Sequence, residues 1–147
     1  MNTEISSKVT LWVNRGIALA VGLMLFLLSW VLRLYSQWRS LEPSAQTAIF
    51  VAYYGCAGVV LFAQWHIEKL LKNILAGEIF IRDNVLRIIR IRWCCILVSL
   101  ICLPAAFYYL PLIFMTIIMG FLGLIVSVVV NVMDAAVKIR EENDLTV

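Results

Sequence analysis

The most restrictive feature of this sequence is a run of 41 residues, between Arg92 and Asp134, that contains no charged side chain. An α-helix rises about 1.5 Å per residue, so this run would measure roughly 60 Å as a single helix. The hydrocarbon core of a bilayer is only about 30 Å thick, and roughly 20 apolar residues cross it. The run therefore predicts two consecutive membrane-spanning helices, joined by a tight turn at Pro111.

Two shorter uncharged runs precede this one, with 17 residues (16–32) and 25 residues (43–67). Each is long enough for one membrane span. The whole chain is 63% hydrophobic and only 14% charged, which excludes an ordinary soluble globular domain. The sequence therefore predicts an all-α, integral membrane four-helix bundle in a single domain (1–147), with spans near 13–34, 45–65, 92–109 and 112–133.

Positive charge is concentrated between the second and third predicted spans, in a segment that we call the waist (residues 66–91). The stretch 65–95, which contains it, holds six of the twelve Lys and Arg residues. In the four-span arrangement ten of the twelve cations lie on one side, and only Arg33 and Arg39 lie on the other. The positive-inside rule therefore predicts a multi-pass membrane protein with both termini, the waist and the tail (134–147) in the cytoplasm.

The waist pattern predicts a cytoplasmic amphipathic helix, over residues 67–76, that lies along the membrane surface between spans 2 and 3. Glu68 and Lys72 are spaced as an i,i+4 ion pair on its polar face. Gly77 is typical of a helix end and is the candidate hinge of the waist. Asp83 or Asn84 is expected to cap a second helix that continues into the third span. The apolar face of the first helix consists of Ile67, Leu70, Leu71, Ile74 and Leu75.

Few polar side chains interrupt the predicted spans. Tyr53 and Tyr54 in the second span are candidates for lining a ligand pocket, but no charged residue accompanies them, so we interpret them as packing residues. Asn131, near the end of the fourth span, is a third candidate intramembrane polar residue, although solvation at the membrane boundary explains it more simply. Gly120 and Gly123 are expected to be points of close contact with another helix.

The sequence lacks the residue patterns of known catalytic sites. It has one histidine, which we interpret as an interfacial side chain, and no pair of acidic residues within a span. The four cysteines show none of the spacings typical of metal sites, so we interpret them as small apolar residues. We therefore expect no enzymatic activity, no catalytic residue, no cofactor and no metal site.

Two segments carry a resemblance to a known family. The closing EENDLTV and the waist segment NILAGEIFIRDNVLRIIRIRW are similar to those of small bacterial four-span membrane proteins of unknown function (DUF2975). Genes of this family often stand beside a small Cro/repressor-type helix-turn-helix regulator. The resemblance implies the four-span fold and this genetic setting, but no activity. The matching waist residues are Asn73, Gly77, Phe80, Asn84, Val85 and Arg90.

Three functions are compatible with these observations. In the first, the protein is a membrane-bound sensor or anti-regulator that docks a small cytoplasmic helix-turn-helix regulator, without contacting nucleic acid itself. In the second it is a small transporter or permease component, and in the third a membrane immunity or structural protein. The expected partners are the lipid bilayer, the regulator and, as a further alternative, a second copy in a homo-oligomer. The candidate docking residues are Arg82, Arg87, Arg90, Glu141, Glu142 and Asp144.

Overall fold

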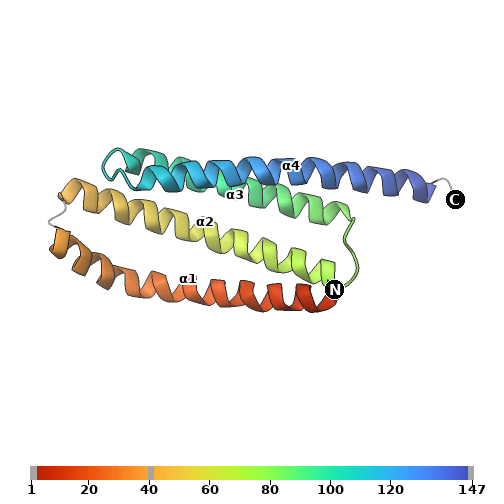
Figure 1. Ribbon diagram of the computed structural model, residues 1–147, viewed down its shortest axis with the longest axis horizontal. Coiled ribbons are helices and arrows are strands. Elements are labelled where there is room, and N and C mark those ends of the chain that lie inside the picture. The colour runs from red at the N-terminus through yellow and green to blue at the C-terminus, as the bar shows by residue number, and fades with distance from the viewer. Residues whose placement is uncertain (1–2, 40–41, 146–147) are drawn as a thin grey trace.

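The computed structural model describes residues 3–39 and 42–145, and its regular elements are four long α-helices (Figure 1). The described ranges contain no β-strand, so the predicted all-α class is confirmed. The first turn of α1, the α2–α3 loop and the last turns of α4 lie at one end of the molecule, which we call the charged end. The helices are α1 (Thr3–Arg39), α2 (Pro43–Leu75), α3 (Arg82–Ala106) and α4 (Leu112–Leu145).

The helices pack in chain order, α1 on α2, α2 on α3 and α3 on α4. In the described part of the chain, the backbones of α1 and α4 do not approach each other, so the helical bundle is open between its first and last helices. The α3–α4 contact is close because Gly123 is buried there, and a Cβ at this position would lie 3.3 Å from Ile96 Cγ1. At Gly120 a Cβ would lie 3.5 Å from Ser99 Oγ. Both glycines are therefore contact points, as predicted.

The outer surface of this bundle is strongly apolar. Phe26 and Phe107 are each 87% exposed, and Phe114 is 68% exposed. Soluble monomers rarely show large contiguous apolar surfaces, whereas hydrocarbon solvates such side chains. The helices α2, α3 and α4 are each long and apolar enough to cross a membrane, and the apolar stretch described in α1, Val9–Met24, is shorter.

The amphipathic helix predicted along the membrane surface is not a separate element. Residues 67–75 are the last turns of α2, which runs without interruption from Pro43 to Leu75. The prediction was wrong because no helix-breaking residue precedes this segment, and because its polar face is held against α1. Glu68 binds Lys72 at 3.0 Å, as its spacing predicted, and also binds Arg15 of α1 at 3.2 Å.

The loop between α2 and α3 begins at Ala76. Gly77 has a φ of +82°, a backbone conformation that favours glycine, so its predicted role as a helix stop is confirmed. The predicted capping of α3 by Asp83 or Asn84 is wrong, since Ile81 is the N-cap and no side chain caps this helix. Asn84 lies inside the first turn instead, and its side chain bonds to the preceding loop. From there α3 continues into the apolar region without a break, as expected.

Candidate functional site

The charged end is built on a buried asparagine. Asn84 has an exposed fraction of 0%, and its Nδ2 donates to the carbonyl oxygens of Glu78 at 2.7 Å and Ile79 at 2.9 Å. Its Oδ1 accepts a hydrogen bond of 2.8 Å from Nδ2 of Asn73, in the last turns of α2. One side chain thus satisfies two loop carbonyls and ties α2 to α3. The residues Asn73, Gly77 and Asn84 of the waist pattern therefore shape this loop.

Two ion pairs join neighbouring helices at the same end. Arg15 of α1 lies 3.2 Å from Glu68 of α2, and Arg82 of α3 lies 3.0 Å from Asp134 of α4. All four side chains remain partly exposed, so solvent screens each pair and its contribution to stability is small. Their main effect is to define which helix faces meet. The sequence did not reveal these pairs because each joins residues more than fifty positions apart.

The two carboxylates in these pairs also have a lysine four residues further along their own helix. Lys72 lies 3.0 Å from Glu68, and Lys138 lies 2.9 Å from Asp134, as the spacing of both pairs predicted. The hydrogen bond from Lys72, followed by that from Arg15, lowers the pKa of Glu68. The hydrogen bond from Lys138 is the main cause that lowers the pKa of Asp134. Both carboxylates are therefore ionised at neutral pH.

The three candidate docking arginines lie in the first turns of α3 but differ in their surroundings. Arg82 is paired with Asp134, as described above. Arg87 donates through Nε to Asp83 Oδ2 at 3.0 Å, and its side chain is only 14% exposed. Arg90 is exposed and forms no ion pair with any acid among residues 42–145. Of the three, Arg90 is therefore the most accessible to another molecule.

The acidic candidates lie farther along α4. Glu141 and Glu142 are exposed, whereas the side chain of Asp144 lies outside the described residues. Glu141 follows Asp134, the partner of Arg82, by seven positions, which is about 10 Å along a helix. The last turns of α4 reach beyond the α2–α3 loop (Figure 1). The structure therefore separates the predicted set into arginines beside the loop and acids at the projecting end of α4.

The candidate intramembrane residues do not form one polar site. Tyr53 lines an apolar cavity of about 280 Å³ that has lining residues from all four helices and no charged residue. The thiols of Cys56 and Cys102 lie 3.7 Å apart in the same lining. Tyr54 is 48% exposed and contacts the ring of Tyr53 edge-on, while Asn131 is exposed on α4. Tyr53 therefore lines a cavity, whereas Tyr54 and Asn131 lie on the outer surface of the bundle.

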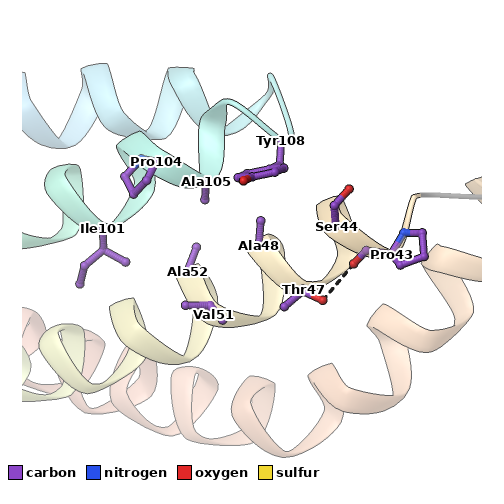
Figure 2. A pocket seen from close by; sticks show the side chains of 10 residues that line it. All are labelled: Pro43, Ser44, Thr47, Ala48, Val51, Ala52, Ile101, Pro104, Ala105 and Tyr108. Carbon is purple, nitrogen blue, oxygen red and sulfur yellow. Dashed lines mark hydrogen bonds between the residues drawn. The ribbon is translucent and has the colours of Figure 1, made fainter.

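A larger cavity of about 570 Å³ opens between α2 and α3 at the opposite end of the molecule (Figure 2). Its polar groups are the hydroxyls of Ser44, Thr47 and Tyr108, and Thr47 donates to the carbonyl oxygen of Pro43 at 2.9 Å. The rest of its lining is apolar, with Ala48 and Ala52 facing Ile101 and Pro104 across the opening (Figure 2). This composition suits a hydrocarbon chain, not a polar substrate.

One buried residue was not recognised from the sequence. His66 has an exposed fraction of 0%, although a histidine at the end of an apolar run suggested an interfacial side chain. Its ring lies 4.6 Å from that of Phe62 and 4.9 Å from that of Trp65, and neither ring nitrogen has a hydrogen-bond partner among the residues that the structure describes. The expectation was wrong because α2 continues past this residue and packs on α3 there, which covers the imidazole.

The electrostatic surroundings of His66, which lies just past the apolar run 45–65, oppose its protonation. Burial is the main cause that lowers its pKa, followed by the positive charges of Arg90, Arg87 and Lys69, whereas Asp83 acts in the opposite direction. The imidazole is therefore neutral at pH 7.

This lowered pKa predicts a loss of stability in mild acid. When folding lowers the pKa of a histidine, the unfolded state binds more protons in acid than the folded state does. The free energy of unfolding is therefore constant above the unfolded-state pKa of about 6.5 and declines as the pH falls below that value. His66 is the only histidine in the chain, so His66→Leu should remove this decline between pH 7.5 and pH 5. Denaturant unfolding in detergent at both pH values measures it. An equal decline in the wild type and the variant would contradict the prediction.

Together, three membrane-length apolar helices in an open bundle, with ion pairs gathered at one end, define a helical membrane protein. The chain belongs to the family described as a protein of unknown function (DUF2975), whose model matches residues 6–147. This match confirms the resemblance seen in the waist and the tail. No curated protein and no solved structure matches the chain.

Proposed function

We propose that this protein is a non-enzymatic, four-span regulatory protein of the bacterial cytoplasmic membrane that docks a small helix-turn-helix regulator on its charged end. The observation that supports this most directly is the projecting end of α4. This helix continues past the α2–α3 loop (Figure 1). In its last turns, Glu141 and Glu142 have exposed side chains. A rigid charged helix end outside the apolar bundle is accessible to a soluble protein.

The distribution of charge supports a cytoplasmic location for this surface. Arg15, Lys69, Arg82 and Lys138 all belong to the charged end, whereas Arg39 closes α1 at the opposite end. Cations flanking membrane spans are retained preferentially in the cytoplasm. In this orientation both termini are cytoplasmic, and the opposite end offers only two short connections to a partner.

The chemistry of the α4 end is complementary to a DNA-binding protein. Such regulators present Lys and Arg to the phosphate backbone of DNA. The carboxylates of Glu141 and Glu142 attract the same basic face, so docking there would keep the regulator away from DNA. A transporter would require charged or strongly polar groups at mid-membrane. The central cavity has no charged lining residue, which favours docking over transport.

The proposal predicts that charge reversal at the end of α4 weakens the complex. The full chain is purified in detergent together with the helix-turn-helix protein encoded beside it. The amount of regulator that the wild type retains is compared with the amount that the Glu141→Lys/Glu142→Lys variant retains. We expect at least a tenfold loss of affinity and a decline with added salt, because two attractive charges become repulsive. Glu42→Lys is the control, since it reverses one exposed carboxylate at the opposite end.

Removal of residues 141–147 should weaken the complex in the same way, without adding new charge. Unchanged binding by both the truncated chain and the charge-reversal variant would rule out this docking surface. If the wild-type chain retains no regulator at all, the transporter and immunity alternatives are favoured instead.

A further inference from the structure

A groove of about 310 Å³ lies between α2 and α3, near the charged end. Because these helices are antiparallel, Phe62 and Gly58 follow one another away from the charged end on α2, as Trp93 and Leu97 do on α3. Arg90 lies at the end of the groove that is nearest the charged end. The lining residues are Gly58, Val59, Phe62, Arg90, Trp93, Cys94 and Leu97.

The two walls of the groove present the same order of side-chain types away from the charged end. On α2, Lys69 is followed away from the charged end by Trp65 and Phe62, at spacings of four and three residues that place them on one helix face. On α3, Arg90 is followed by Trp93 after three residues and by an apolar residue four positions later. Each wall therefore runs from a cation, through a tryptophan, to apolar side chains. A phospholipid in a bilayer leaflet has the same order of phosphate, interfacial glycerol and acyl chain.

Arg90 lines the groove, and Lys69 lies on the same face of α2 as Phe62, nearer the charged end. Arg90 and Lys69 form no ion pair within residues 42–145. Lys69 Nζ lies 3.9 Å from the centroid of the Trp65 ring, so this side chain is held beside the tryptophan. The charges of both cations lower the pKa of His66. Asp83, the acid that raises this pKa, is already paired with Arg87. The mouth of the groove therefore carries a net positive charge that an anion would neutralise.

The deeper part of the groove is open and apolar. No atom lies within 4 Å of a Cβ built on Gly58, so this glycine leaves space beside α2. Phe62 is 50% exposed, Leu97 is 46% exposed and Trp93 is 54% exposed. A hydrocarbon chain would cover these apolar surfaces.

We propose that this groove binds one anionic phospholipid, with its phosphate against Arg90 and Lys69 and one acyl chain along Phe62, Leu97 and Gly58. The tryptophans Trp65 and Trp93 then lie beside the glycerol region, where their rings are favoured. This inference does not depend on the proposed docking of a regulator, because it concerns a different face and a different partner.

Binding is measured by native mass spectrometry of the full chain in mild detergent. The protein is titrated with phosphatidylglycerol or with phosphatidylcholine of identical acyl chains. We expect a one-to-one adduct with phosphatidylglycerol and at least fivefold weaker binding of phosphatidylcholine. Arg90→Gln and Lys69→Gln should each lower the affinity for phosphatidylglycerol about fivefold and that for phosphatidylcholine by less, since both lipids carry a phosphate but the choline cation offsets its charge. Gly58→Leu should weaken the binding of both lipids, because the leucine side chain fills the space for the acyl chain.

Two matched variants control for charge and for volume. Lys138→Gln removes one positive charge at the same end but outside the groove, and Gly22→Leu adds the same side chain at an open position of α1. Both should bind phosphatidylglycerol like the wild type. Circular dichroism checks the fold of each variant, and the substitutions of the exposed Arg90 and the half-buried Lys69 keep the test decisive if Gly58→Leu does not fold.

Several outcomes would overturn the proposal. One is equal affinity of the wild type for the two lipids, and another is an equal effect of Lys138→Gln and Arg90→Gln. Displacement of the lipid by inorganic phosphate at similar concentration would show a free anion site without a role for the acyl chain. A dimer mass that appears in place of the lipid adduct would show that a second copy of the chain covers the groove.

Discussion

Replacing Asn84 with leucine is expected to lower the free energy of unfolding by about 3 kcal/mol or more. The substitution removes three hydrogen bonds: the two that Asn84 donates to the carbonyl oxygens of Glu78 and Ile79, and the one that it accepts from Asn73. Leucine has a similar branched shape, but it is larger than asparagine and can neither donate nor accept a hydrogen bond. The measurement is reversible unfolding in mixed micelles titrated with a denaturing detergent, followed by circular dichroism.

Two asparagine variants serve as comparisons. Asn73→Leu removes only the bond between the two side chains, so it should cost roughly a third as much, about 1 kcal/mol. Asn131→Leu changes an exposed side chain on α4 and should have little effect. If Asn84→Leu were as mild as Asn131→Leu, the loop would not depend on this side chain.

Replacing Gly123 with leucine is expected to separate α3 from α4 and to cost about 3 kcal/mol or more. A Cβ at this position already lies 3.3 Å from Ile96 Cγ1 and 3.6 Å from Cys95 Cβ. It also lies 3.9 Å from the backbone nitrogen of Ile96. The further atoms of leucine would therefore clash with a main chain, which cannot move aside as a flexible side chain can. The same micelle unfolding experiment measures the loss of stability.

Gly22→Leu is the matched control for this substitution. It makes the same chemical change within an apolar helix, but no atom lies within 4 Å of its Cβ position. We therefore expect a change below about 1 kcal/mol there. Similar losses at Gly22 and Gly123 would mean that the added bulk of leucine, not the α3–α4 contact, determines the cost, since leucine has a higher helix propensity than glycine.

The waist pattern acquires a physical meaning from these contacts. Asn73 and Asn84 bond to each other, and Gly77 provides the positive φ between them. Phe80, from the same pattern, is 43% exposed at the loop, and its apolar side chain takes no part in the hydrogen bonds of the two asparagines. The asparagines and the glycine therefore serve to build the turn that returns the chain from α2 to α3, while Arg90 is available at the mouth of the groove.

The helical type and the approximate positions of the four apolar segments were determined by local sequence alone. Uncharged runs of span length and the 3.6-residue period depend only on neighbouring residues, so they predicted α3 and α4 and the i,i+4 pairs of Glu68 and Asp134. Gly77 was recognised for the same reason, because a helix stop is a property of one residue's backbone.

The tertiary structure decided what lies between helices. The bond of Arg82 to Asp134, the burial of His66 and the return of the Asn84 side chain to the loop depend on which faces of α2, α3 and α4 meet. The continuity of α2 past residue 66 has the same cause, since contacts with α1 and α3 favour one straight helix over an interfacial turn. Distances across a helix interface depend on packing of side chains far apart in the chain, and no local period specifies them.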